Sequence, residues 1–128
     1  MDVRTLAGAF SWNELLAANV EEAKLFYTRL FGWTAEGSEM SDGGAYTLFK
    51  VNGDAVGGLW QLPAEAQQQG ARPYWGAYVT VDDVDETMRK ARDLGASVIV
   101  EPMDIPGTGR FATIQDPQGA IISFIKYE

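Results

Sequence analysis

The sequence contains two helix signals of the same kind, one in each half. Near the start, Asn19 precedes two acidic residues and a run of apolar residues at helical spacing, and Gly32 follows the last turn. In the second half, Asp82 or Asp83 takes the capping position and Gly95 ends the helix. The helix starts lie 64 positions apart (84 minus 20) and the closing glycines 63 apart (95 minus 32). This spacing predicts two similar modules in one chain.

Short β-rich runs surround both predicted helices. In the first half they lie at 10–18, 33–40, 45–51 and 55–62, with turns at Asp42-Gly43-Gly44 and Asn52-Gly53-Asp54. In the second half they lie at 74–81, 98–100, 110–115 and 120–127, with a loop at 103–109 and a turn at Asp116-Pro117-Gln118-Gly119. Residues 63–73 are polar and predict a surface linker. The chain is therefore predicted to be a single α+β domain of two βαβββ modules, at about 9–62 and 74–127.

The composition narrows the range of partners. Of the 128 residues, 46% are hydrophobic, which is enough for a buried core, and 18 acidic against 10 basic side chains give a net charge of −8. This charge repels nucleic acid and anionic membrane surfaces. No apolar run reaches the roughly 20 residues that cross a bilayer, and the N-terminus lacks the pattern of a signal peptide. We expect a cytoplasmic protein with neither a nucleic acid nor a membrane as its partner.

Several motifs, in this order and spacing, resemble those of the vicinal oxygen chelate superfamily, the glyoxalase, bleomycin-resistance and dioxygenase group. In the first half they are Trp12-Asn13-Glu14-Leu15, Ala23-Lys24-Leu25-Phe26-Tyr27 and Leu30-Phe31-Gly32-Trp33. In the second half they are Val81-Asp82-Asp83-Val84-Asp85, Leu94-Gly95-Ala96, Pro106-Gly107-Thr108-Gly109-Arg110-Phe111 and Asp116-Pro117-Gln118-Gly119-Ala120. The sequence around Trp12 and Phe31-Gly32-Trp33 also resembles that of a subgroup whose members are often labelled hydroxylases. The resemblance implies two βαβββ modules whose eight strands form a curved sheet around a cleft, and a homodimer; it does not imply a reaction.

Metal-dependent members of that superfamily place four ligands in the cleft, on the first and last strand of each module. The resemblance puts these positions at Trp12, Gly58, Gly76 and Ser123. None of these is a usual metal ligand, and the chain has no histidine and no cysteine. We therefore expect no metal site and no cofactor, and the metal-dependent reactions of the superfamily are disfavoured. Without a histidine, no serine can be activated as in a catalytic triad.

Strand alternation predicts which side chains line the cleft. If Trp12 faces inward, Glu14 does too, and the same parity applied from Gly58, Gly76 and Ser123 turns further side chains inward. The predicted ligand-binding residues are Trp12, Glu14, Tyr46, Gly58, Trp60, Tyr74, Gly76, Tyr78 and Ser123. The two glycines leave room, so the pocket suits a flat or aromatic organic molecule. The alternative is that the aromatic residues fill the interior as core.

Glu14 is the candidate catalytic residue. Burial in apolar surroundings raises the pKa of a carboxyl group, which suits a general acid or base, and a carboxylate can also anchor a ligand amine or hydroxyl. The alternative is a structural partner to a nearby hydroxyl or backbone group. Two functions remain open: a metal-free protein that sequesters an aromatic or cationic organic molecule, and a cofactor-independent tailoring enzyme in which Tyr46 or Tyr78 assists Glu14.

Other polar motifs are predicted to be scaffold. The acidic cluster at 82–85 is predicted to cap the second helix rather than to bind a metal. Asp116-Pro117-Gln118-Gly119 is predicted to form a β-turn and to have no role in binding. The glycine-rich loop before Arg110 is not followed by a helix, which argues against a phosphate site, although Arg110 can still lie at the cleft mouth. In the first helix, spacing predicts that three residues are core: Leu25, Phe26 and Leu30.

Overall fold

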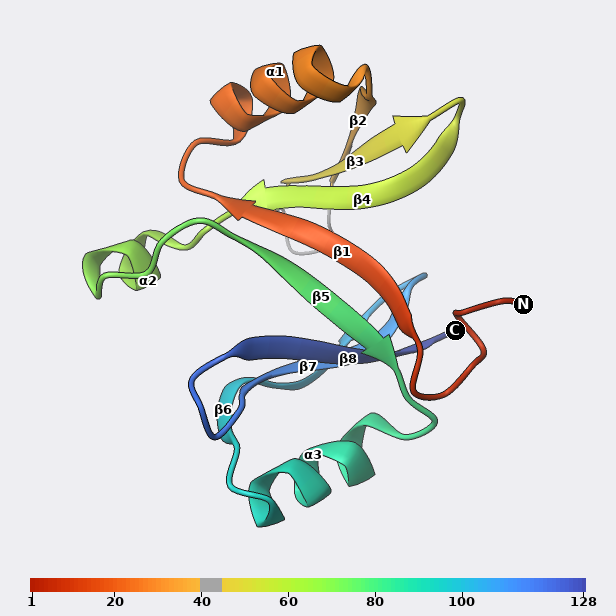
Figure 1. Cartoon of the computed structure of the whole chain (residues 1–128), viewed down its shortest axis with the longest axis vertical. Coiled ribbons are helices and arrows are strands. Elements are labelled where there is room, and N and C mark those ends of the chain that lie inside the picture. The colour runs from red at the N-terminus through yellow and green to blue at the C-terminus, as the bar shows by residue number, and fades with distance from the viewer. Residues whose placement is uncertain (40–44) are drawn as a thin grey trace. The chain divides into compact units, whose positions relative to one another are not determined.

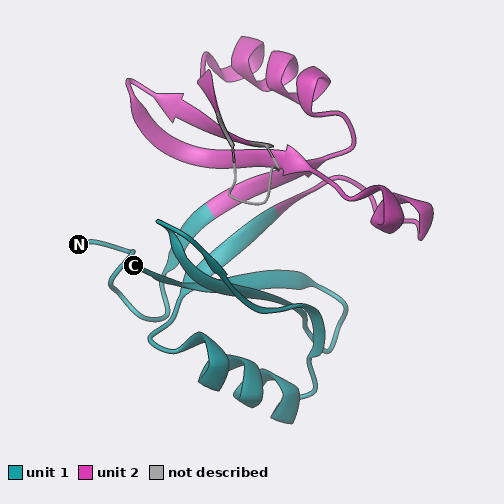
Figure 2. Cartoon of the chain, turned by 180° about the vertical axis from the view of Figure 1, so that it is seen from behind, with its two compact units in different colours: residues 1–12, 76–128 teal, residues 13–75 magenta. Residues whose placement is uncertain are grey.

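The computed structural model describes residues 1–39 and 45–128, so the predicted turn at Asp42-Gly43-Gly44 and the end of the strand at Met40 lie outside the described residues. The described elements are β1 (Phe10–Ala17), α1 (Val20–Phe31), β2 (Thr34–Glu39), β3 (Ala45–Val51), β4 (Asp54–Gln61), α2 (Ala64–Gln68), β5 (Tyr74–Thr80), α3 (Val84–Asp93), β6 (Ser97–Ile105), β7 (Gly109–Gln115) and β8 (Ile121–Tyr127) (Figure 1). They form two compact units, residues 13–75 and residues 1–12 with 76–128 (Figure 2).

The first module follows the predicted βαβββ plan. Its strands lie in the order β2-β3-β4-β1, and β1 runs parallel to β4 while β2, β3 and β4 pair antiparallel. Asn19 caps α1 by accepting a hydrogen bond from the backbone N–H of Glu22, and Gly32 takes the left-handed conformation (φ 73°) that ends the helix. One sheet face packs under α1, where Leu15, Phe49 and Leu59 are buried.

The second module repeats the plan. Its strands lie in the order β5-β8-β7-β6, with β5 parallel to β8 and the other pairs antiparallel. Asp83 caps α3 through the backbone N–H of Glu86, and Gly95 follows with a positive φ of 97°. Val84 and Met88 of α3 pack on Ala112 and Phe124. The α+β class and the two βαβββ modules are thus confirmed.

The segment 63–73, predicted to be a surface linker, contains the short helix α2, which has no buried residue. One predicted boundary is wrong. The strand predicted at 98–100 extends as β6 to Ile105, across residues assigned to a loop, because β6 pairs with β7 along its length. Its register shifts near Val100 break the regular alternation on which strand prediction depends.

The prediction that the apolar residues of α1 are core is also wrong. Leu25, Phe26 and Leu30 are 54, 57 and 55% exposed. A different stripe of α1 packs toward the sheet, and it consists of Val20, Ala23 and Tyr27. The helix therefore has apolar residues on two sides, and spacing alone does not tell which side is buried.

No helix in the part of the chain that the structure describes is long and apolar enough to cross a membrane.

Candidate functional site

The site begins with a buried carboxylate on β1. Glu14 is 7% exposed, and the Tyr46 hydroxyl of β3 donates a hydrogen bond to its Oε1 at 2.9 Å. Strand register explains the contact: Glu14 and Leu48 both pair with Gly58 of β4, and Tyr46 lies two residues before Leu48. Paired and alternate residues share a sheet face, so these side chains project from the same face. That face is opposite the one under α1, where Leu15 and Phe49 pack.

Gly58 lets the two polar groups meet. A Cβ at this position would lie 1.7 Å from the Tyr46 hydroxyl oxygen and 2.4 Å from its ring carbon Cζ. Any larger residue would therefore push the phenol away from Glu14. The room that the glycine leaves in this module is taken by the Tyr46 ring.

Two further aromatic residues of the same unit accompany Glu14. Trp60 of β4 pairs with Leu16 of β1 and so lies on the same sheet face as Glu14. Its Nε1 is buried and finds no hydrogen-bond acceptor among the described residues. The pKa of Tyr74 is raised, first because burial disfavours the phenolate and second because the negative charge of Glu14 repels it. The face therefore combines a carboxylate, two phenols and an indole N–H.

The remaining predicted site residues belong to the second compact unit and lie among core residues. Tyr78 and Ser123 pair in the register of β5 and β8, and both are buried. Tyr78 packs with Phe111 and Ile125, and the half-buried Trp12 lies against this cluster. The hydroxyls of Ser123 and Thr113 are 2.7 Å apart. Gly76 is buried in β5. In this unit these side chains make core contacts and a hydroxyl–hydroxyl hydrogen bond. That they bind a ligand stays a prediction.

Arg110 is occupied by carboxylates. Its guanidinium donates hydrogen bonds to both carboxylate oxygens of Asp85 at 2.9 and 3.0 Å and to Asp104 at 3.1 Å. The first of these interactions lowers the pKa of Asp85 and raises that of Arg110. Arg110 thus ties β7 to the start of α3, which agrees with the prediction that this region is scaffold.

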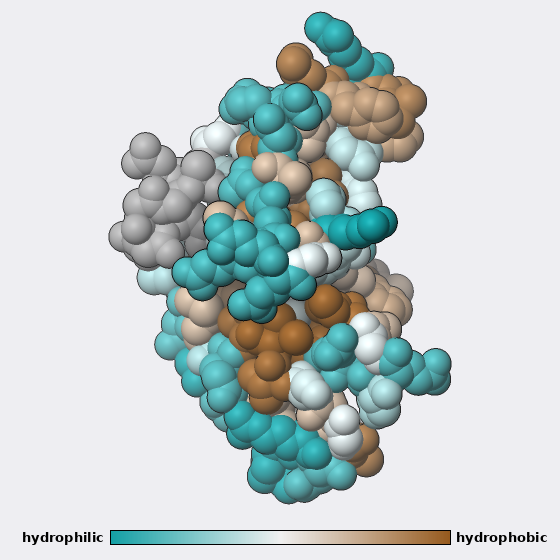
Figure 3. All heavy atoms as spheres, turned by 90° about the vertical axis from the view of Figure 1, so that its left-hand side faces the viewer, coloured by the Kyte–Doolittle hydropathy of each residue, from teal (hydrophilic) through white to brown (hydrophobic). Residues whose placement is uncertain are grey.

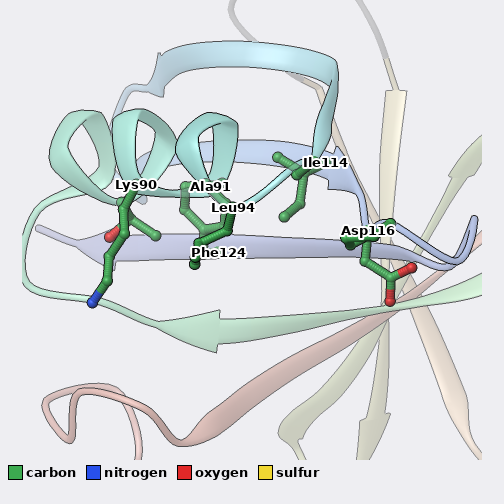
Figure 4. Close-up of a pocket in the computed structure, with 9 residues that line it drawn as sticks. Lys90, Ala91, Leu94, Ile114, Asp116 and Phe124 are labelled. Atoms are coloured by element: carbon green, nitrogen blue, oxygen red, sulfur yellow. The ribbon is translucent and has the colours of Figure 1, made fainter.

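An apolar depression of about 260 Å³ lies beside α3 in the second module. In Figure 4 its labelled walls come from the C-terminal half of the helix and from β7 and β8, with Lys90 and Asp116 at its margins. Its lining residues are Thr87, Lys90, Ala91, Leu94, Ala96, Ile114, Asp116, Pro117 and Phe124. No local sequence pattern predicts this depression, because its walls are brought together only by the packing of α3 on the sheet.

The two modules, their register and the motifs they carry agree with one family. Residues 9–124 match the family model of the Glyoxalase/Bleomycin resistance protein/Dioxygenase superfamily. The chain belongs to this superfamily. The match includes both βαβββ modules, and it confirms the resemblance seen in the motifs around Phe26-Tyr27 and Asp116-Pro117.

Two curated superfamily relatives are similar over most of this chain. The Mycobacterium tuberculosis protein named "Putative glyoxylase CFP32" is 41% identical over 119 residues, which cover 93% of this chain and 44% of that protein. The Streptomyces peucetius anthracycline biosynthesis protein DnrV is 33% identical over 127 residues, which cover 91% of this chain and 46% of that protein. The chain thus spans about half the length of these relatives.

Solved structures share the superfamily fold at low sequence identity. Methylmalonyl-CoA epimerase from M. tuberculosis superposes with a TM-score of 0.64 at 19% identity, covering 95% of this chain and 93% of the other. The hypothetical protein BH1468 from Bacillus halodurans gives a TM-score of 0.68 at 14% identity, with 96% of each chain covered. These similarities establish the fold.

The donor chemistry of this superfamily member does not fit the superfamily's metal site. The positions that the resemblance assigned to ligands hold Trp12, Gly58, Gly76 and Ser123, which offer no imidazole, thiolate or carboxylate. At Gly58, the Tyr46 phenol occupies the space that a ligand side chain would need. Among residues 1–39 and 45–128, no three His, Cys, Asp or Glu side chains come together as a candidate metal centre.

Proposed function

We propose that this superfamily member binds a small organic molecule, without a metal ion, on the sheet face that carries Glu14. The observation that carries the proposal is the buried Glu14 carboxylate held by the Tyr46 hydroxyl, with the Trp60 indole N–H on the same face. A carboxylate accepts up to about four hydrogen bonds, so it can accept a ligand donor in addition to Tyr46.

The polar groups on this face indicate the chemistry of the ligand. A buried indole N–H without an acceptor costs about 1–3 kcal/mol, which an acceptor atom on a ligand would recover. Glu14 favours an ammonium or hydroxyl group, and the rings of Trp60 and Tyr74 favour a flat, aromatic body. We therefore propose a ligand that is aromatic, presents an acceptor to Trp60 and presents a cationic or hydroxyl donor to Glu14.

The second candidate function is a cofactor-independent tailoring enzyme. The name of the similar anthracycline biosynthesis protein from S. peucetius supports it, as does the Glu14–Tyr46 hydrogen bond. In this mechanism Glu14 removes a proton from a bound substrate and returns it at another atom of the same molecule, so that the substrate isomerises and needs no co-reactant. Tyr46 would stabilise the Glu14 carboxylate before the first transfer and after the second, and the protonated Glu14 would hold the proton between them.

We also propose that the chain forms a homodimer, which the resemblance implies and which light scattering of the purified chain would test. The composition favours the cytoplasm, which fractionation of the source cells would test.

Native mass spectrometry of freshly purified protein is the first experiment. An organic mass retained without a transition metal would support the binding function and provide a ligand to identify. A stoichiometric transition metal would contradict the metal-free proposal. The same sample then reports binding of a defined probe, the anthracycline daunorubicin, which is flat, aromatic and carries an ammonium group. Its binding is measured by isothermal titration calorimetry.

Matched variants test the role of Glu14. Glu14→Gln keeps the acceptor for Tyr46 but removes the charge, and it should weaken daunorubicin binding at least about tenfold, a loss of about 1.4 kcal/mol. Asp54→Asn removes one negative charge from an exposed position of the same unit and should leave binding unchanged. Equal weakening in both variants would mean that daunorubicin responds only to net charge. If the wild type shows neither an organic mass nor saturable binding, the proposal is wrong.

Turnover separates the two candidate functions. If the compound identified by mass spectrometry is converted at a rate that depends on pH and is abolished in Glu14→Gln, the tailoring function replaces sequestration. Tight binding of an unchanged compound supports sequestration.

A further inference from the structure

The outer face of α1 is an exposed apolar surface. It consists of Leu25, Phe26 and Leu30 at more than half exposure, and these three residues with Arg29 line a shallow depression of about 320 Å³. Figure 3 shows hydrophobic atoms at the surface near the top of the view, where Figure 1 has α1, among largely hydrophilic surroundings. Large exposed apolar patches on soluble domains mark interaction sites more often than chance.

The face rests on a firm base. The Tyr27 ring contacts the rings of Phe26, Trp33, Phe49 and Trp75, with centroids 5.0 to 6.1 Å apart. The Trp75 indole N–H also donates to the Tyr27 hydroxyl at 3.2 Å. The outward side chains therefore project from a helix that is held in place, which lowers the ordering cost of an association.

The charges that flank this face are self-complementary. Glu22 and Arg29 are exposed and lie seven residues apart on α1, so they fall on the same stripe of the helix as the apolar residues between them. The midpoint between them falls between Leu25 and Phe26. A two-fold axis through that midpoint places Glu22 of one copy opposite Arg29 of the other when the two helices run antiparallel.

We propose that the outer face of α1 is the contact between two copies of this chain, with the two α1 helices antiparallel. Leu25 of each copy packs against Phe26 of the other, Leu30 lies toward the end of the apolar contact, and two Glu22–Arg29 pairs flank its centre. This inference rests on the homodimer in the proposed function and names its surface. The net charge of −8 argues against the rival occupant, an anionic membrane surface.

The size of the face predicts the strength of the association. A stable interface buries about 800 Å² per partner, and a single helix face with three large apolar side chains supplies less than that. We therefore expect a reversible dimer whose population rises with protein concentration.

Sedimentation velocity over a concentration series tests the apolar part of the face. The variant with Phe26→Lys and Leu30→Lys should remain folded, because both side chains are exposed within one chain, and should sediment as a monomer throughout. The matched control is Leu94→Lys, just after α3, where the side chain is 71% exposed, and this variant should dimerise like the wild type. Circular dichroism melting of each variant verifies that it is folded.

A charge exchange tests the antiparallel arrangement. Glu22→Arg or Arg29→Glu alone places two like-charged pairs in the interface and should raise the dissociation constant about tenfold or more. The double variant exchanges the charges within each copy and should restore the wild-type dissociation constant. Restoration supports the proposed geometry, and a double variant that is weaker than either single variant overturns it.

A wild type that is monomeric at every concentration overturns both the homodimer and its surface. A dimer that persists in the Phe26→Lys, Leu30→Lys variant keeps the homodimer but overturns the α1 surface. Daunorubicin titration of the same variants reports independently on the Glu14 site.

Discussion

The helices α1 and α3 occupy the same place in two copies of one module, yet they present different surfaces. Both begin with a side-chain cap whose oxygen accepts a backbone N–H at 3.0 Å, from Asn19 in one and Asp83 in the other. In α3, the outward side chains are charged, and Arg89 bridges Glu86 and Asp93. In α1, by contrast, the outward side chains include Leu25, Phe26 and Leu30.

The difference separates the features that each module needs in order to fold, the helix caps and closing glycines, from the outward helix face, which can vary between modules. The caps and closing glycines recur because they satisfy backbone groups at helix ends in either module. The outward face contributes little to folding of a single copy, so its composition reflects what covers it. Water covers the charged face of α3, and we attribute the apolar face of α1 to a second copy of the chain.

The opposite sheet faces differ in the same way. The first module presents the Glu14–Tyr46 hydrogen bond there, whereas the second presents Tyr78 packed with Phe111 and Ile125. On this face, the first module therefore has a hydrogen-bonded carboxylate and phenol where the second module has a cluster of packed apolar and aromatic side chains.

The largest expected contrast between the helices lies in their contribution to stability. Met88 of α3 is 2% exposed, so Met88→Ala should lower the free energy of unfolding by about 2–5 kcal/mol. Phe26→Ala on α1 should change it by only about 0.5 kcal/mol, because the side chain is largely exposed. Urea denaturation at a concentration where the wild type is monomeric measures both. A loss of several kcal/mol in Phe26→Ala would mean that one chain covers its own α1 face.

The helix caps should show a smaller and equal effect. Asn19→Ala and Asp83→Ala each remove the acceptor for one backbone N–H at the helix start and should each cost about 1 kcal/mol in urea denaturation. The equality follows from the shared geometry of the two caps. A cost confined to one helix would show that the other module tolerates fraying of its first turn.

Much of the fold was predictable because its signals are local. The caps Asn19 and Asp83 and the glycines after both helices depend on a few neighbouring residues, and β3 has the predicted bounds. The errors arise where local patterns are ambiguous. In α1, two apolar stripes compete for the sheet, and in β6, shifts of register near Val100 hide a long strand.

The candidate site was predictable in its residue types but not in its contacts. Parity placed Glu14 and Trp60 on one face, and β1 and β4 pair accordingly. The fit between Gly58 and the Tyr46 phenol depends on the register of β3 against β4, which alternation alone does not fix. Whether this face binds a ligand remains a prediction.

A titration tests the polar sheet face of the first module. The pKa of Tyr74 is raised by burial and by the charge of Glu14, so Tyr74 remains neutral at a pH where an unfolded tyrosine ionises. Its stabilising contribution is therefore complete below about pH 10 and is lost as the pH rises through the folded-state pKa. Glu14→Gln should lower this pKa only in part, because burial is the larger cause. The absorbance of tyrosinate, with Tyr74→Phe as the reference, measures the shift, and an unchanged pKa in Glu14→Gln would show that the two groups do not interact.

The smallest effect concerns acid stability and again separates the two helices. Hydrogen bonds from Arg110 lower the pKa of Asp85 at the start of α3, so the pair stabilises the fold above the ordinary aspartate pKa of 3.8 and loses this contribution as the pH falls below it. Among the residues that the structure describes, Glu22, two residues after the start of α1, forms no ion pair. Asp85→Asn removes the carboxylate that Arg110 stabilises, so it should reduce stability near neutral pH and flatten the decline of stability in acid. Both effects should be small, because Asp85 is exposed and solvent screens its charge. Glu22→Gln is the matched comparison on α1 and removes one charge from its first turn. Urea denaturation from pH 3 to 7 compares them, and parallel profiles for the two variants would show that the charged face of α3 contributes no more to the fold than the face of α1.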